Sequence, residues 1–296
     1  MATGTFTCIY SLKSNEHRLM FTLNCRGRLL VVDKPLVMGI INTTPDSFYA
    51  GSRVSGETQL LQQAEQMLKD GAAILDIGGQ STRPGSARIG AEEELQRLIG
   101  AISAIHRRFP EAYISVDTYW SAVAKEAVAA GACIVNDISA GLFDSNMLST
   151  VAQLNAPYIC MHIKGTPETM QENPVYENLV REVLDFFIER IRLCRQAGIK
   201  DIIVDPGFGF GKTIRHNFEL LRQLSLLQVL ELPLMVGLSR KSTVWKTLGI
   251  TADEALNGTT VLHTIALLNG THILRVHDVK EAVEAVKLVQ ALKQAM

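Results

Sequence analysis

The sequence predicts an α/β protein, a (β/α)8 TIM barrel preceded by a short β-hairpin. Three observations support this prediction: eight apolar runs rich in Val and Ile, amphipathic segments between them, and glycines where several of these segments end. Nearly continuous apolar strands are typical of a parallel sheet that is buried on both faces. Eight strand–helix units favour a closed barrel, and the alternative is an open, doubly wound sheet.

The predicted strands recur along most of the chain, and each is followed by polar or glycine-rich residues. They are Leu36–Asn42, Ala73–Gly79, Ala112–Thr118, Cys133–Ser139, Pro157–Ile163, Asp201–Gly207, Pro233–Ser239 and His272–Asp278. The predicted helices include Glu57–Asp70, Ala91–Phe109, Trp120–Ala130, Val175–Ala197, Glu254–Asn269 and Val279–Ala295. Several of the helices end on a glycine just before the next strand, where a left-handed C-cap is expected: Gly71, Gly131, Gly198 and Gly270.

The residues before the first strand alternate apolar and polar side chains. Thr5–Leu12 and Arg18–Val32 show this alternation, and the second surrounds a turn at Asn24–Gly27, which predicts a small hairpin over the barrel floor. We therefore divide the chain into a hairpin extension, residues 1–34, and a barrel domain, residues 35–296. A length of 296 residues also allows two smaller domains, but the sequence contains no evident linker.

Composition and charge exclude several classes of protein. Apolar residues make up 47% of the chain and charged residues 20%, which is typical of a globular protein with a large core. The formal net charge of −1 gives no indication of a nucleic-acid or membrane partner. The five scattered cysteines lack a zinc or redox spacing, so we expect reduced core residues. Without an apolar leader or an apolar run of membrane length, we expect a cytoplasmic protein.

Polar side chains stand at the end of every predicted strand. They are Asn42, Ser81–Arg83, Asp117, Asn136–Asp137, His162, Asp205, Ser239–Lys241, and Arg275 with His277. Because the carboxyl ends of barrel strands meet at one mouth, these side chains are expected to line one site. Asp117 and Asp205 directly follow apolar strands and would be partly desolvated, so they need hydrogen-bond donors. The pattern therefore predicts a small, nitrogen-rich ligand.

The same mouth would concentrate cations in a chain that is almost neutral overall. Lys241, Arg275 and Arg83, together with His277, suit a phosphate or diphosphate group. Asn42 could help to hold a Mg²⁺ ion that bridges the diphosphate. Arg83 could instead be an ordinary exposed arginine.

The glycine-rich segment Pro206–Thr213 resembles a P-loop only in part. Pro206 stands where the first required glycine should be, and Phe208 and Phe210 occupy the turn, so we reject a nucleoside triphosphatase. The glycines are instead expected to let the backbone approach a flat ligand, with one of the two phenylalanines against its ring. The histidines show neither a zinc spacing nor a Ser-His-Asp order, so hydrolytic chemistry has no support.

Seven segments of the chain together resemble the dihydropteroate synthases, in that family's order. They are Met38–Phe48, Asp76–Gly85, Ser115–Thr118, Asn136–Ile138, Asp205–Lys212, Gly237–Lys241 and Arg275–Asp278. The resemblance runs from about Leu36 to the C-terminus and leaves the hairpin outside. It implies an enzyme that condenses 6-hydroxymethyl-7,8-dihydropterin diphosphate with p-aminobenzoate, giving 7,8-dihydropteroate and pyrophosphate, with Mg²⁺ as cofactor.

The resemblance also implies roles for individual residues. Those that bind the pterin would be Asp117, Asn136, Asp205 and Lys241, with Met161 on its face. Those that hold the diphosphate would be Asn42, Thr82, Arg275 and His277, with Asn42 also on the metal. Those that form the p-aminobenzoate pocket would be Thr82, Arg83, Phe210, Ser239 and Arg240, and sulfonamides, which mimic this substrate, should bind there too.

An aromatic amine is a weak nucleophile, so a route in which the C–O bond breaks first to leave a pterin cation is easier than direct displacement. The site must then stabilise the cation and the departing pyrophosphate at two places. Asp46 on the first loop would favour the cation. The residues expected to be catalytic are therefore Asp46, Asn42, Lys241, Arg275 and His277.

Two positions depart from the family pattern, which often has Glu where Gln80 stands and Asp where Ala50 stands. They leave open a catalytically silent pterin-binding or assembly subunit. A second alternative is a pterin-dependent methyltransferase domain, which would share the pterin residues but not the diphosphate set. The resemblance finally implies a homodimer that forms through outer helices.

Overall fold

The protein is described by a computed structural model that covers residues 20–43, 53–80 and 88–295. Its centre is an eight-stranded parallel sheet in the order β8-β7-β6-β5-β4-β3-β10-β9. The strands are β3 (Leu36–Asn42), β4 (Ile74–Gly78), β5 (Tyr113–Asp117), β6 (Ile134–Asp137), β7 (Tyr158–Met161), β8 (Ile202–Asp205), β9 (Met235–Val236) and β10 (Ile273–Val276).

A backbone bridge joins the two edge strands of this sheet. Val204 of β8 pairs in parallel with Leu234, which directly precedes β9, and the Val204 amide donates to the Pro233 carbonyl at 2.9 Å. The strand here, Met235–Val236, is shorter at both ends than the predicted Pro233–Ser239, and Pro233 at the first end has no N–H to donate to a ladder. The bridge closes the sheet, so the predicted (β/α)8 barrel is confirmed.

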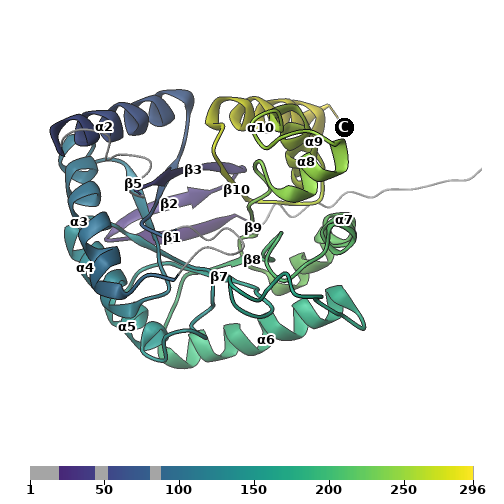
Figure 1. Cartoon of the computed structure of the whole chain (residues 1–296), viewed down its shortest axis with the longest axis horizontal. Helices are drawn as coiled ribbons and strands as arrows, with labels where there is room; N and C mark the ends of the chain where they lie inside the picture. Colours follow the sequence, from purple (N-terminus) through teal and green to yellow (C-terminus); the bar gives the residue numbers. More distant parts are fainter. Residues whose placement is uncertain (1–19, 44–52, 81–87, 296) are drawn as a thin grey trace, which may run out of the picture.

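Helices surround the strands on the outside (Figure 1). They are α2 (Arg53–Asp70), α3 (Ala91–Arg108), α4 (Ser121–Ala130), α5 (Met147–Leu154), α6 (Leu179–Ala197), α7 (Ile214–Arg222), α8 (Ser242–Leu248), α9 (Leu256–Leu268) and α10 (Val279–Gln294), with a 3-10 helix η1 (Leu224–Leu230). Helix α6 begins four residues later than the predicted Val175 because the Asn178 side chain accepts a hydrogen bond from the Arg181 amide and caps it. Helices α5, α7 and α8 were not among the predicted ones.

The predicted glycine C-caps are confirmed. Gly71, Gly131, Gly198 and Gly270 all have a positive φ, between +89° and +130°. At Gly131 a side chain would also lack space, because a Cβ there would lie 2.5 Å from Cγ of His106. These glycines end their helices and turn the chain into the next strand.

The hairpin lies against the floor of the barrel, as predicted from Arg18–Val32, whereas Thr5–Leu12 lies outside the described residues. Strand β1 (Phe21–Cys25) pairs antiparallel with β2 (Arg28–Val32). The side chains on one face of the hairpin pack against side chains of the barrel strands. Together they form a single apolar cluster. The cluster contains Leu23, Cys25, Leu30 and Val32 together with Leu36, Met38, Ile74, Cys133, Ile134, Ile159, Ile203, Met235 and Ile273. The hairpin therefore closes the lower end of the barrel with apolar contacts.

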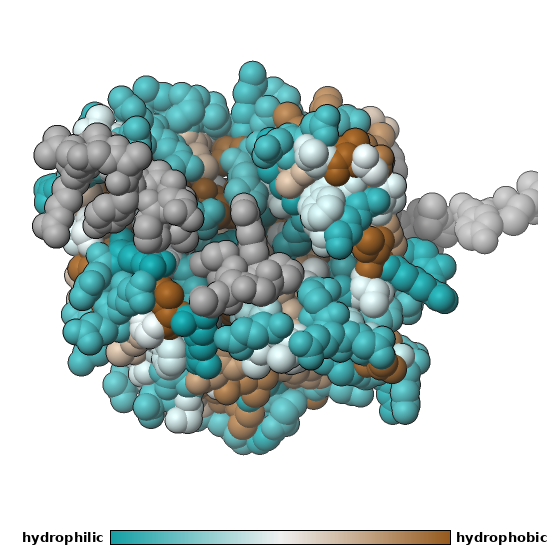
Figure 2. Space-filling model, in the orientation of Figure 1, coloured by the Kyte–Doolittle hydropathy of each residue, from teal (hydrophilic) through white to brown (hydrophobic). Residues whose placement is uncertain are grey.

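A larger apolar core lies between the strands and the surrounding helices. Four of the cysteines are buried free thiols, as predicted: Cys25, Cys133, Cys160 and Cys194. Across the described part of the chain, every helix is too short or too polar to cross a membrane. Much of the visible surface in Figure 2 is hydrophilic.

Candidate active site

Side chains alternate along the strands and place a polar layer inside the barrel, above its apolar floor. This layer contains Asp76 of β4, Asp117 of β5, Asn136 of β6, Asp205 of β8 and Arg275 of β10. Their neighbours in the chain point outward into the core under the helices: Leu75, Ile77, Val116, Val135, Val204, Leu274 and Val276. The polar residues thus share the barrel interior although they come from five strands.

Arg275 connects two of the carboxylates in this layer. Its Nε donates to Asp76 Oδ2 at 2.6 Å, and its Nη2 donates to Asp117 Oδ2 at 2.5 Å. The side-chain Nδ2 of Asn136 donates to the same Asp76 oxygen at 3.1 Å. Asp76 was not among the site residues predicted from the sequence, although an aspartate within the apolar run of a predicted strand was an available signal; the structure shows that it is fully buried.

Burial sets the pKa values of the groups in the layer. Burial raises the pKa of Asp117 to about 7 despite the attraction of Arg275, and repulsion from Asp76 adds to the increase. Burial also raises the pKa of Asp205 and lowers the pKa of Lys241 to about 8, although each of these two groups stabilises the charged form of the other. The site therefore contains groups that change protonation close to neutral pH.

Two buried polar atoms in this layer have no hydrogen-bond partner within the described residues. They are Asp76 Oδ1 and Ser115 Oγ, on residues that face each other across β4 and β5. A buried carboxylate oxygen without a donor is costly, so a bound molecule with an N–H or O–H group would stabilise it. This observation agrees with the prediction of a ligand rich in N–H groups.

An apolar wall stands beside the polar layer. Phe210 and Met161 belong to one small cluster with Tyr119, Ile138, Ile163 and Met170. The ammonium group of Lys241 lies 4.5 Å from the centre of the Phe210 ring and donates to the Phe208 carbonyl oxygen. A flat ring between this wall and the carboxylates would contact apolar atoms on its face and polar atoms on its edge.

The outer rim is formed by the ends of β9 and β10. Ser239 Oγ lies 3.1 Å from His277 Nδ1 and accepts a hydrogen bond from the His277 amide at 3.2 Å. The Arg240 guanidinium donates to both oxygens of Asp278, at 2.8 and 2.9 Å. Asn42 is exposed at the end of β3. Asp46, Thr82 and Arg83 lie outside the described residues.

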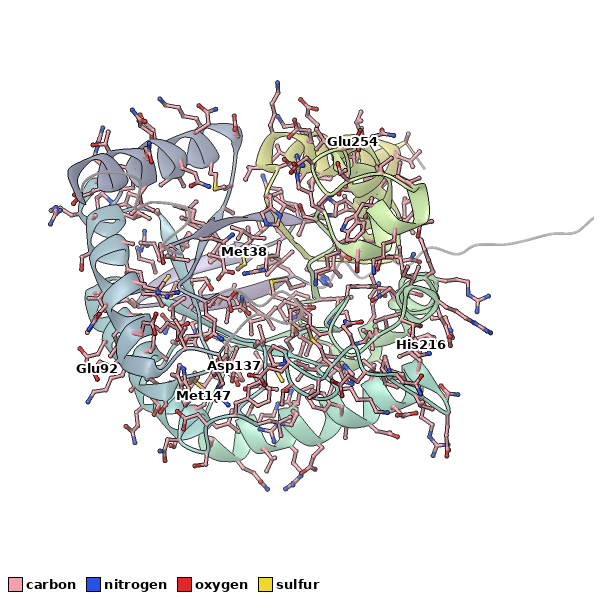
Figure 3. All side chains as sticks on the ribbon, viewed as in Figure 1. Met38, Glu92, Asp137, Met147, His216 and Glu254 are labelled. Atoms are coloured by element: carbon pink, nitrogen blue, oxygen red, sulfur yellow. The ribbon has the colours of Figure 1, made fainter. Side chains whose placement is uncertain are left out.

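Two residues that were expected at the mouth point away from it. Asp137 follows the inward-facing Asn136, and its carboxylate binds the Tyr158 hydroxyl and the Ser139 amide, each at 2.7 Å. In the view of Figure 3, Asp137 projects toward the side of the barrel on which Met147 of the outer helix α5 is labelled. His162 follows the inward-facing Met161 and packs edge-on against Phe186 of α6, with ring centres 4.8 Å apart. Adjacent residues of a strand face opposite sides, so neither side chain can share the interior with its neighbour.

The glycine-rich segment after β8 is not a phosphate-binding loop. Lys212 is only 2% exposed, and its ammonium group lies 2.8 Å from His162 Nδ1 and donates to the Gly207 carbonyl at 3.0 Å. The expectation that these glycines admit a flat ligand was wrong for two of them. A Cβ at Gly207 would collide with the His162 carbonyl oxygen, and one at Gly211 with the Lys164 carbonyl oxygen. These glycines therefore allow two loops to pack.

The donor set for a metal ion is sparse. Within residues 20–43, 53–80 and 88–295, no three His, Cys, Asp or Glu side chains are grouped to hold an ion. Asn42 offers a single carboxamide oxygen at the mouth. This set fits Mg²⁺, which commonly keeps several waters and takes substrate phosphate oxygens alongside one or two protein ligands.

Comparison with known proteins agrees with this geometry. The family described as "Pterin binding enzyme" matches residues 38–277. The dihydropteroate synthase of Escherichia coli K12 is 45% identical over 275 residues, which are 92% of this chain and 97% of that enzyme. The chain belongs to the dihydropteroate synthase family.

Solved structures of dihydropteroate synthases share the fold of this family member. The Yersinia pestis dihydropteroate synthase with a sulfonamide drug complex is 42% identical, with a TM-score of 0.87, and the match covers 93% of this chain and 100% of that one. The Xanthomonas albilineans dihydropteroate synthase with 4-aminobenzoic acid is 38% identical, with a TM-score of 0.85, and the match covers 92% and 98%.

One of the two departures from the dihydropteroate synthase pattern lies within the described residues. Gln80 is buried, and its Oε1 accepts a hydrogen bond from the Tyr119 hydroxyl at 2.8 Å. A glutamate could accept the same hydrogen bond, so glutamine preserves the contact without adding a buried charge. Ala50 lies outside the described residues.

Proposed function

We propose that this transferase condenses 6-hydroxymethyl-7,8-dihydropterin diphosphate with p-aminobenzoate, releasing 7,8-dihydropteroate and pyrophosphate. The C–O bond to the diphosphate breaks, a C–N bond to the amine forms, and the amine loses a proton. The main support is the Arg275 bridge between Asp76 and Asp117, which gathers buried acceptors for a nitrogen-rich ring above an apolar floor. Solved relatives bound to 4-aminobenzoic acid and to 7,8-dihydropteroate support the substrate and product classes.

The pterin would occupy the inner polar layer. Asp117, Asn136 and Asp205 would accept from its N–H groups, Lys241 would donate to it, and Met161 would lie on its face. To these residues we add Asp76, because its unpartnered Oδ1 needs a donor at this depth.

The diphosphate would bind between the polar layer and the rim. Two nitrogens of Arg275 are held by Asp76 and Asp117, so its guanidinium is fixed in orientation and its Nη1 edge is the one that a phosphate oxygen would take. Asn42 and His277 would hold the diphosphate from the rim, with Thr82 as a further donor. Mg²⁺ would be held by Asn42 and would neutralise part of the charge on the leaving group.

The p-aminobenzoate would lie farther out, against Phe210 and near Ser239, Arg240, Thr82 and Arg83. The two nitrogens of Arg240 that bind Asp278 are not open for a bidentate contact with a carboxylate. Arg240 would therefore contribute to the pocket by lining it and by the positive charge that it places near the substrate carboxylate. Sulfonamides would compete for this pocket, in line with the sulfonamide complex of the Yersinia pestis relative.

The reaction would proceed by early loss of pyrophosphate, since an arylamine is a weak nucleophile. Asp46 would favour the pterin cation, while Arg275, His277 and the Mg²⁺-binding Asn42 would stabilise the leaving group. Lys241 would orient the ring during this step. Preorganised groups of this kind typically contribute about 2 to 4 kcal/mol each to transition-state stabilisation.

A pyrophosphate-release assay tests the proposal against a catalytically silent subunit. We expect release that requires both substrates and Mg²⁺ and that a sulfonamide inhibits. A pure, folded sample that released no pyrophosphate under these conditions would favour the silent subunit. A methyltransferase domain is not favoured, since the curated relatives of Escherichia coli and Haemophilus influenzae are dihydropteroate synthases.

We also propose that the chain is a cytoplasmic homodimer. Large apolar side chains are exposed along α9 and α10, at Val261, Ile265, Leu268, Leu288 and Leu292. Pairing of these helices with those of a second copy would remove apolar surface from water. Sedimentation equilibrium should give twice the monomer mass, and replacing Leu268 and Leu288 with lysine should give monomers.

A further inference from the structure

Asp278 occupies the N-cap position of α10 but does not cap the helix. Aspartate at this position usually accepts a hydrogen bond from an amide in the first helical turn. Here the side chain makes no such bond. Its Oδ2 accepts from Arg240 Nε at 2.8 Å and its Oδ1 from Arg240 Nη2 at 2.9 Å. Both carboxylate oxygens of Asp278 therefore bind Arg240, in the loop after β9, and neither caps α10.

The partner of this carboxylate has a strained backbone. Arg240 has a φ of +52°, in the left-handed region that side chains other than glycine rarely adopt. Such a conformation persists only where the surroundings fix it. The Arg240 Nη1 donates to the carbonyls of Asp253 and Ala252 at 2.7 and 3.2 Å, and the Arg240 amide donates to Thr259 Oγ1 at 3.0 Å. Asp278 supplies the two ionic contacts of this set.

The residues on both sides of Arg240 belong to the proposed site. Ser239 contacts His277 through its hydroxyl, and Lys241 faces the Phe210 ring. Two successive ties, Ser239 to His277 and Arg240 to Asp278, thus connect the loop after β9 to the loop after β10. Arg240 directly follows Ser239, so the contacts that fix Arg240 also restrain the backbone that carries the Ser239 hydroxyl.

We propose that Asp278 is a positioning residue for the p-aminobenzoate pocket. It holds the Arg240 backbone in the left-handed conformation and so helps to place Ser239 at the rim. The inference rests on the proposed function. Lys241 is also held by the Phe208 carbonyl oxygen deeper in the barrel, so loss of Asp278 should affect the pterin less.

The substitution Asp278→Ser separates the positioning of Arg240 from the stability of α10. Serine can cap the helix, but it cannot accept two hydrogen bonds from the Arg240 guanidinium as a carboxylate does. We expect the KM for p-aminobenzoate to rise about tenfold or more, whereas the KM for the pterin diphosphate should change by less than about threefold. Asp278→Glu, which keeps a carboxylate for Arg240, should recover most of the affinity. Thermal unfolding measured in parallel shows whether each variant is folded at the assay temperature.

Glu189→Ser is the matched control. Glu189 also binds an arginine with both oxygens, since Arg192 donates to it at 2.8 and 3.1 Å, but this pair lies on the outside of α6. Neither KM should change in the control. A wild-type KM for p-aminobenzoate in Asp278→Ser would overturn the inference, and so would equal increases in both KM values. An inactive wild-type enzyme would instead refute the proposed function, and the inference with it.

Discussion

Arg275 and Asp76 are 199 positions apart in the sequence, yet Arg275 Nε lies 2.6 Å from Asp76 Oδ2 inside the barrel. The same guanidinium binds Asp117, so one cation holds two buried carboxylates. Strand β10 pairs with β3, and β3 pairs with β4, so only one strand separates the strand of Arg275 from that of Asp76. The fold thus creates a charge arrangement that no local segment of the chain contains.

Replacing Arg275 with methionine should destabilise the protein as well as inactivate it. Removal of one partner of a buried ion pair leaves the other uncompensated, which typically costs about 3 to 5 kcal/mol. We expect urea unfolding to show a loss of about 3 kcal/mol and kcat/KM to fall on the order of 10²-fold. Adding Asp76→Asn to this variant should restore part of the stability but not the activity. Unchanged stability in Arg275→Met would contradict the bridging role.

The pH dependence of kcat/KM should follow Asp117 and Lys241. Asp117, with its pKa raised to about 7, becomes protonated below that pH and can no longer accept a second N–H bond. Lys241, with its pKa lowered to about 8, loses its charge above that pH. The kcat/KM for the pterin diphosphate depends on the protonation states of the free enzyme. It should therefore have a narrow maximum between the pKa values of Asp117 and Lys241 and fall at lower and at higher pH. Asp117→Asn should lack the acidic limb, and a wild-type profile that stays flat from about pH 6 to 9 would refute the assignment.

Lys212 should prove to be structural. Burial holds the pKa of Lys212 well below its usual range, and its amine bonds to carbonyl groups of its own loop. Lys212→Met leaves these acceptors without a donor, so we expect a loss of about 1 to 3 kcal/mol in unfolding free energy. The KM for the pterin diphosphate should stay within about twofold of the wild-type value. A tenfold higher KM in a folded variant would instead indicate that the segment binds phosphate.

Much of the architecture could be predicted from the sequence. Apolar runs located all eight strands, and glycines located the helix ends at Gly71, Gly131, Gly198 and Gly270. The apolar run located β9 but overestimated its length, since only Met235–Val236 form the strand and Pro233 has no N–H to donate to the ladder.

Part of the site could also be predicted, because a residue at the end of a barrel strand must lie near the mouth. The alternation of side chains would have excluded Asp137 and His162, since each follows a residue that faces inward. The pairing of Arg275 with Asp76 could not be predicted. It depends on which side chains of two strands, 199 positions apart in the sequence, lie at the same height inside the barrel. The packing of Gly207 against the His162 carbonyl likewise depends on contacts between two loops.

The most direct test is calorimetric titration of the pterin diphosphate, with and without Mg²⁺, into the wild-type protein and Asp205→Asn. The positive charges of Lys241 and Arg275 favour the charged form of Asp205, and its Oδ1 accepts a hydrogen bond from the Gly207 amide at 2.8 Å. We expect Mg²⁺-enhanced binding to the wild type and an affinity at least about tenfold lower for Asp205→Asn, or about 1.4 kcal/mol. Equal affinities of the two folded proteins would contradict the placement of the pterin within this polar layer.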